Sequence, residues 1–171
     1  MKKSEGMGMI QLIAIVIFII LIVASTVYFV RMKYHEARIE TIKTDMLQVQ
    51  WKIKDYMDKQ TVKGEEKQYL GTKLSEMTSD SLLQDLFSSN ILVEQEYEKY
   101  YVLTDENLAT AGLEITNYKD SYFIINYETY EVIVSKGCEY AKDEILYKLS
   151  DIISKTNDVK KEEVNEINIE E

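Results

Sequence analysis

The pattern of hydrophobic and polar residues changes near residue 30. From Met7 to Val30 most positions are apolar and none is charged. From Ile39 to Tyr56 apolar residues recur every three or four positions, between charged and amide side chains. The first segment reaches the length of about 20 apolar residues that a membrane-spanning helix needs. The second is typical of an amphipathic helix.

The two segments are predicted to form one helix. The chain contains no proline, and no glycine occurs between Met9 and Lys63, so no residue here interrupts a helix. The helix should continue to about Gln60 and end before Gly64. We expect its apolar stripe to pack, as a coiled-coil seam or against a small domain. The stripe comprises Ile39, Ile42, Met46, Val49, Ile53 and Tyr56.

The apolar run is predicted to stay in the membrane. A secretory signal has a shorter apolar region, of about 7 to 15 residues, before a small-residue cleavage site. The sequence at residues 24–26, Ala-Ser-Thr, is a poor cleavage site. Tyr28 and Phe29, followed by Arg31 and Lys33, are typical of a membrane interface. The far edge of the span is therefore expected near residue 30.

Positive charges flank both ends of this span. Lys2 and Lys3 precede it, and Arg31, Lys33 and Arg38 follow it. Because short cytoplasmic flanks carry the excess of Lys and Arg, the balance here leaves the orientation open.

The residues before the apolar run suggest a family. The leader "MKKSEG", followed by "MGMIQL", resembles the class III signal of type IV pilins and type II secretion pseudopilins. The resemblance implies that a prepilin peptidase cuts after Gly6, on the cytoplasmic side, and that Met7 becomes the new, usually methylated, N-terminus. The run would remain as a membrane anchor and later become part of a filament core. The N-terminus would be cytoplasmic and the C-terminal domain extracytoplasmic.

Gln11 departs from the family pattern. By resemblance it occupies the fifth position after the cut, where the family usually has a glutamate that neutralises the N-terminus of a neighbouring subunit. An amide offers hydrogen bonds without charge, which favours a weaker contact or a minor subunit. A cut after Gly8 would instead place Ile13 at that position. An ordinary uncleaved signal anchor is a further alternative.

A small α+β domain is predicted at residues 64–155. We expect a short helix over residues 82–87 behind capping side chains at residues 78–80. A strand at residues 100–103 should precede a helix that Thr104 caps and Gly112 closes. Together with the hairpin described next, this order resembles the globular part of pilin-like proteins of Gram-positive bacteria.

The clearest β signal is "SYFIINYETYEVIVSK", residues 121–136. Its alternation predicts a hairpin with a turn near residues 128–129 and one core face. A helix is expected over Tyr140 to Ser154, on the spacing of its isoleucines and leucines. The acidic segment 156–171 is expected to be a mobile tail.

Composition argues against several classes of function. The chain has 30 acidic and 20 basic residues, a net charge of -10, so the isolated subunit is not expected to bind nucleic acid. Cys138 is the only cysteine and His35 the only histidine, so neither an intramolecular disulfide nor a zinc site is expected. No glycine-rich phosphate loop occurs. We therefore predict no enzyme activity and no cofactor.

The remaining acidic and aromatic residues are expected to serve the surface and the packing of the domain, not a ligand site. Glu94, Glu96 and Glu98 alternate on a possible strand, and Asp105 with Asn107 could offer oxygens to calcium, but their spacing fits no defined calcium loop. We expect a solvated acidic surface and no metal site. Trp51 and the 13 tyrosines are expected to pack in the core or as cross-strand pairs.

These observations combine into one expectation. The fold class is α+β, with a long N-terminal helix, part membrane span and part amphipathic, packed on a small antiparallel sheet. The expected divisions are 1–6 (leader), 7–30 (span), 31–63 (amphipathic continuation), 64–155 (domain) and 156–171 (tail). The resemblance implies a subunit of a type IV pilus, competence pilus or secretion filament, with a prepilin peptidase, other pilins, a membrane assembly platform and the lipid bilayer as partners. The alternative is an uncleaved single-span protein with a juxtamembrane coiled coil and an extracytoplasmic binding or sensor domain.

Overall fold

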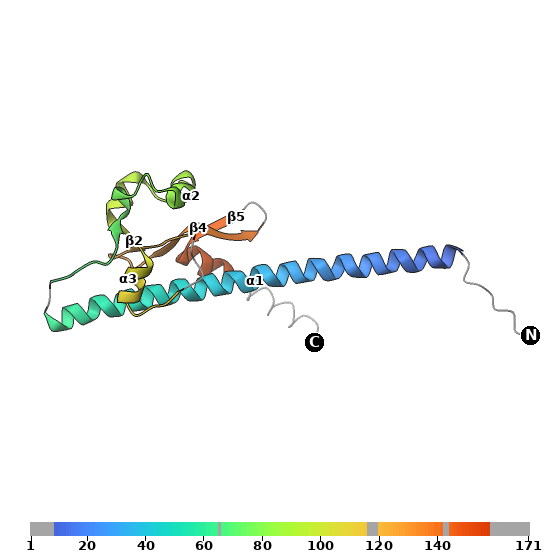
Figure 1. The fold of residues 1–171 in the computed structure, drawn as a ribbon, viewed down its shortest axis with the longest axis horizontal. Helices are drawn as coiled ribbons and strands as arrows, with labels where there is room; N and C mark the ends of the chain where they lie inside the picture. Colours follow the sequence, from blue (N-terminus) through green and yellow to red (C-terminus); the bar gives the residue numbers. More distant parts are fainter. Residues whose placement is uncertain (1–8, 65, 116–119, 142–143, 158–171) are drawn as a thin grey trace, which may run out of the picture. The chain divides into compact units, whose positions relative to one another are not determined.

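The computed structural model describes residues 9–64, 66–115, 120–141 and 144–157 (Figure 1). The chain divides into two compact units, Met1–Arg38 and Ile39–Glu171. One helix, α1 (Met9–Lys63), contributes to both. The second unit adds a small antiparallel sheet to its part of α1. A long N-terminal helix and a small antiparallel sheet confirm the predicted α+β class.

The second half of α1 buries the predicted stripe. Five of its six residues, from Ile39 to Ile53, are buried as expected. Beyond Ile53 the buried face continues through Met57 and Gln60, whereas Tyr56 is half-buried. Tyr56 therefore lies at the edge of the stripe, whose centre passes from Ile53 to Met57 and Gln60. The helix ends at Lys63, and Gly64 follows with a positive φ of 69°.

Five strands form one antiparallel sheet in the order β1-β2-β3-β4-β5. Their bounds are β1 (Thr72–Lys73), β2 (Tyr100–Leu103), β3 (Phe123–Asn126), β4 (Val132–Ala141) and β5 (Glu144–Lys148). The predicted strand at residues 100–103 and the predicted hairpin are both confirmed. Asn126 organises the hairpin turn, since its Oδ1 accepts hydrogen bonds from the N–H groups of Glu128 and Thr129.

The prediction of a helix over residues 140–154 was wrong in its first part. Strand β4 continues to Ala141, β5 returns over Glu144–Lys148, and only residues 149–157 are helical. The two strands pair with Cys138 opposite Leu146 and Glu139 opposite Ile145. This pairing with the preceding strand satisfies the backbone of residues 144–148 and overrides the helical spacing of their apolar residues.

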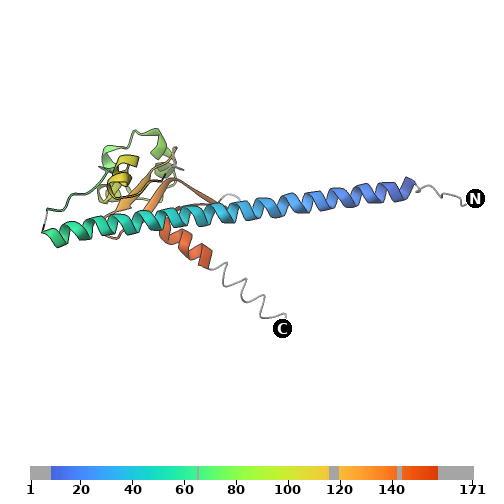
Figure 2. The ribbon, with the colours of Figure 1, turned by 60° about the horizontal axis from the view of Figure 1, so that its bottom comes forward.

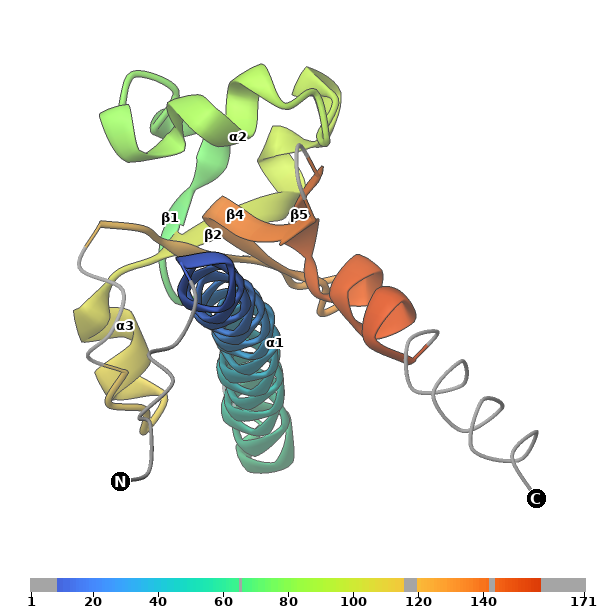
Figure 3. The same ribbon diagram turned by 90° about the vertical axis from the view of Figure 1, so that its right-hand side faces the viewer.

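Both faces of the sheet are buried, whereas the sequence predicted one core face for the hairpin. Phe123 and Ile125 of β3 join the core cluster that contains the stripe of α1. Ile124, between them, joins a second cluster together with Leu83 and Leu86. The sheet is therefore the middle of three layers, with α1 on one side and α2 on the other (Figure 3).

The layer on the side of the sheet opposite α1 is termed here the cover segment, residues 74–99. Its elements are the 3-10 helices η1 (Leu74–Glu76), η2 (Ser81–Leu83) and η3 (Glu94–Lys99) and the helix α2 (Gln84–Ser88). The predicted cap is confirmed, because Asp80 Oδ1 accepts a hydrogen bond from the Leu82 N–H at 2.9 Å. The possible strand at residues 94–98 is instead η3, where Glu96 accepts a hydrogen bond from the Val93 N–H.

Two further helices flank α1 within the second unit. Helix α3 (Asp105–Thr110) is capped by Thr104 as predicted, and Gly112 follows it with a positive φ of 81°. Residues 149–157 lie beside α1 (Figure 2), where Lys43 Nζ donates a hydrogen bond to the Thr156 hydroxyl at 3.2 Å. The first two residues of the predicted tail, 156 and 157, belong to this helix. Residues 158–171 lie outside the described part of the chain.

Candidate functional site

The first half of α1 carries a continuous apolar surface. Of the helices that the structure describes, α1 alone is long and apolar enough to cross a membrane. Between Leu12 and Val30 its side chains are exposed, and most of them are large and hydrophobic. Such a surface is unfavourable in water and favourable in a lipid bilayer. This segment has the length and composition of a single membrane span.

The hydroxyl groups of Ser25 and Thr26 in the span donate hydrogen bonds to backbone carbonyls of the same helix. Ser25 Oγ donates to the carbonyl of Leu21 at 2.8 Å, and Thr26 Oγ1 donates to the carbonyl of Ile22 at 2.9 Å. These bonds within one turn of helix remove the cost of an unpaired hydroxyl in hydrocarbon. Neither residue therefore interrupts the span.

The predicted processing and contact residues lie at the start of the chain. Gly6, Met7 and Gly8 are outside the residues that the structure describes. Gln11 lies in the first turn of α1, and Ile13, its counterpart after a cut at Gly8, is exposed. The roles of Gly6, Met7 and Gln11 stay predictions.

The acidic and histidine residues form no metal site in the described part of the chain. No group of three or more His, Cys, Asp or Glu side chains there is placed to hold an ion. Asn107 Oδ1 accepts hydrogen bonds from the Thr104 N–H and hydroxyl. Glu98 lies 2.8 Å from Lys73 Nζ, and the hydrogen bond and charge of that lysine lower the pKa of Glu98. Asn107 thus takes part in the cap of α3, and Glu98 forms an ion pair with Lys73.

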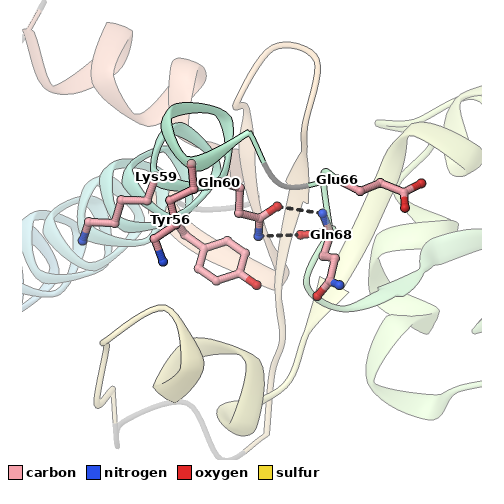
Figure 4. Close-up of a pocket in the computed structure, with 6 residues that line it drawn as sticks. Tyr56, Lys59, Gln60, Glu66 and Gln68 are labelled. Carbon is pink, nitrogen blue, oxygen red and sulfur yellow. Dashed lines mark hydrogen bonds between the residues drawn. The ribbon is translucent and has the colours of Figure 1, made fainter.

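A polar pocket of about 280 Å³ lies where α1 ends (Figure 4). It is lined by Tyr56, Lys59, Gln60, Lys63, Glu66 and Gln68. Its phenol, amide, ammonium and carboxylate groups can make hydrogen bonds to a small polar molecule. Among the described residues that line it there is no serine, cysteine or histidine, so these residues form no hydroxyl or thiol nucleophile with an imidazole base beside it.

Two side chains hold the extended segment 66–70 beside this pocket. Gln60 Oε1 accepts from the Gln68 N–H at 2.7 Å, and Gln60 Nε2 donates to the Gln68 carbonyl at 3.3 Å. The Tyr127 hydroxyl accepts from the Leu70 N–H and donates to the Leu70 carbonyl, both at 2.8 Å. We term these four bonds the clamp. They satisfy backbone N–H and carbonyl groups of Gln68 and Leu70 that, in a sheet, would pair with a neighbouring strand. Burial raises the pKa of Tyr127, so its hydroxyl keeps the proton that it donates.

Aromatic residues divide between packing and exposure. Tyr69, Tyr101 and Tyr127 form a cluster with ring centroids 4.6 to 5.4 Å apart, which confirms packing for these three. Trp51 is 62% exposed, so the expectation that it packs was wrong. Its position two residues from both Val49 and Ile53, outside the stripe spacing, was the signal that it faces away from the core.

Loss of the clamp hydroxyl should weaken the domain. Tyr127→Phe keeps the ring stack but leaves the Leu70 N–H and carbonyl unpaired, at an expected cost of about 2 kcal/mol in the free energy of unfolding. Urea unfolding of the detergent-solubilised full chain, followed by near-UV circular dichroism, measures this loss. Tyr69→Phe is the matched control, since it keeps the same stack, and it should change stability by less than about 0.5 kcal/mol. Equal losses in the two variants would show that the clamp contributes nothing.

Comparison of the chain with known protein families, with curated proteins and with solved structures gives no match.

Proposed function

We propose that this chain is a pilin-like or pseudopilin subunit. In this proposal it is cleaved after Gly6, held in the membrane by the first half of α1, and assembled through that helix into a filament. The observation that carries the proposal is the division of α1. Its first half exposes a continuous apolar surface, and its second half is part of the core of a small α+β domain. Together with the leader motif, one helix with these two roles suits a subunit that moves from bilayer to filament.

Assembly would move the apolar half of α1 from lipid into contact with the helices of other subunits. In the bilayer its side chains contact lipid, and in a filament the same side chains would contact the helices of other subunits. Gln11 would supply hydrogen bonds in that bundle without the charge that the family usually uses, which favours a minor subunit. The partners in this proposal are a prepilin peptidase, other pilins or pseudopilins and a membrane assembly platform. The filament would be a type IV pilus, a competence pilus or a type II secretion-like filament.

The N-terminus of the mature chain tests the proposal. Intact mass and N-terminal peptide mapping of the membrane-extracted protein from its native host should show a chain that begins at Met7, with a methyl group on its amine. Gly6→Trp should abolish this processing, and Gly6→Ala should reduce it less, because the peptidase must fit the residue before the cut. A chain that still begins at Met1, or unchanged cleavage of the Gly6→Trp variant, would contradict the proposal.

The pocket favours a second candidate function. An uncleaved single-span protein would use its extracytoplasmic domain as a binding or sensor module, and the polar lining at the end of α1 would be its ligand site. An intact leader together with ligand-dependent protection of the segment 66–70 from hydrogen exchange would support this candidate over the first.

A further inference from the structure

We propose that the polar pocket at the end of α1 binds a neutral sugar of one or two rings. This inference names the ligand class for the second candidate function, on which it rests only in taking the pocket as a ligand site. It is independent of whether the leader is cleaved, because every residue that lines the pocket belongs to the second unit of the chain.

The polar groups of the pocket are of two kinds. Gln60 holds the fold together, because its side-chain amide bonds the N–H and the carbonyl of Gln68, at 2.7 Å and 3.3 Å. The Tyr56 hydroxyl and the side-chain amide of Gln68 differ, since within the part of the chain that the structure describes neither makes a hydrogen bond. We term these two the open polar groups. Both donate and accept hydrogen bonds, so both can bind a ligand.

The open polar groups face the pocket from two different elements. Tyr56 belongs to α1, and Gln68 belongs to the extended segment 66–70. Figure 4 shows the Tyr56 hydroxyl and the Gln68 amide turned toward one another across the pocket. The helix fixes the backbone of Tyr56, and the clamp fixes the backbone of Gln68. A site whose backbone is already held in place loses less entropy when a ligand binds.

The charges of the lining cancel. Lys59 forms an ion pair with Asp55 at 2.7 Å, and the other two charged residues of the lining, Lys63 and Glu66, have opposite signs. The pocket therefore offers no net charge that would complement a strongly anionic or strongly cationic ligand.

The direction of the charged groups also argues against a zwitterion such as an amino acid. Figure 4 shows the Lys59 ammonium and the Glu66 carboxylate pointing in opposite directions, away from the Tyr56 hydroxyl. A small zwitterion would need an ammonium and a carboxylate of the protein close together at the centre of the pocket. The groups that face the centre are instead a phenol and an amide, which suit an uncharged ligand.

A sugar ring has the properties that this lining can recognise. Its hydroxyl groups donate and accept hydrogen bonds, as the open polar groups do. One face of the ring carries C–H groups, which can pack on an aromatic side chain such as the half-buried Tyr56. The volume of about 280 Å³ lies near the lower end of the range for small-molecule pockets, so one or two rings fill it.

Saturation-transfer difference NMR on the full chain tests the inference, in a detergent without a sugar head group so that the detergent does not compete. The probes are maltose, cellobiose and N,N′-diacetylchitobiose. At least one of them, added up to about 20 mM, should bind with a dissociation constant of about 1 mM or lower, which a few hydrogen bonds can supply. Glycine, a zwitterion, and phosphate, an anion, should not bind. No binding of any sugar, or binding of glycine or phosphate alone, would overturn the inference.

Gln68→Ala and Tyr56→Phe test whether the sugar lies in this pocket. Gln68→Ala keeps the clamp, because Gln60 bonds only the backbone of Gln68, and Tyr56→Phe keeps the ring. Each should raise the dissociation constant about fivefold, the equivalent of one hydrogen bond, without changing urea unfolding. Gln95→Ala, at an exposed glutamine of η3, is the matched control and should bind as the unchanged chain does. Full affinity in both pocket variants would overturn the assignment.

The N-terminus of the same preparation distinguishes failure of this inference from failure of the proposed function. Sugar binding by chains that keep Met1 would support the inference and contradict the pilin proposal. Chains that begin at Met7 and bind none of the three sugars would contradict the inference and leave the pilin proposal supported.

Discussion

Gly71→Ala is expected to cost the soluble domain about 4 kcal/mol of unfolding free energy, near the upper end for single substitutions. Gly71 has a positive φ of 95°, a conformation that residues with a side chain rarely adopt. A Cβ at this position would also lie 2.4 Å from the carbonyl oxygen of Val102. Backbone strain and steric overlap therefore act together.

The overlap at Gly71 has no easy relief. Val102 is fully buried and belongs to β2, where it pairs with Ile124 on one side and with Thr72 on the other. Because the obstacle is a backbone atom held in the sheet, the chain can make room only by breaking the β1–β2 pairing. Loss of this pairing would also release the cover segment that follows β1.

Gly64→Ala is the matched control for Gly71→Ala. Gly64 also has a positive φ, of 69°, but no atom lies within 4 Å of the added Cβ. Only the conformational strain remains, which we expect to cost about 1 kcal/mol. Urea unfolding of the detergent-solubilised full chain, followed by the near-UV signal of the tyrosines, compares the two. Losses of the same size at both positions would mean that the close approach to Val102 is absent.

Val49→Asp should destabilise the domain by about 4 kcal/mol or more, since it places an unpaired carboxylate in the core. Val49 is fully buried on the stripe of α1. The buried residues of its cluster are all apolar or, at Cys138, a thiol, so none of them can pair with the new charge. The membrane span should be unaffected, because it belongs to the other unit of the chain.

Membrane sedimentation and protease sensitivity distinguish the expected loss of domain stability from the expected retention of the membrane span. The Val49→Asp variant should still sediment with membranes, while its soluble domain becomes sensitive to protease at low temperature. Gln48→Asp introduces the same carboxylate at the neighbouring, exposed position and should change stability by less than about 0.5 kcal/mol. If Gln48→Asp were as damaging as Val49→Asp, the orientation of α1 against the sheet would be wrong.

Local interactions made much of the fold predictable. The long helix follows from the missing helix breakers, and its stripe from the spacing of apolar residues between Ile39 and Ile53. Asp80 and Thr104 cap helices as predicted, because a cap joins a side chain to backbone groups only a few residues away. The leader motif that carries the proposed function is also a property of neighbouring residues.

Sequence alone thus determined the elements whose cause lies within a few residues: the apolar span, the stripe of α1, the caps and the hairpin. Only the tertiary structure decided what depends on distant partners. The cover segment buried the second face of the sheet. Residues 144–148 are a different case: they form a strand by pairing with the neighbouring strand β4, although the spacing of their apolar residues suits a helix. The approach to Val102 requires glycine at position 71, and the clamp joins Tyr127 to Leu70. The cover segment, the approach to Val102 and the clamp arise from contacts between residues far apart in the chain, which periodicity and propensity do not encode.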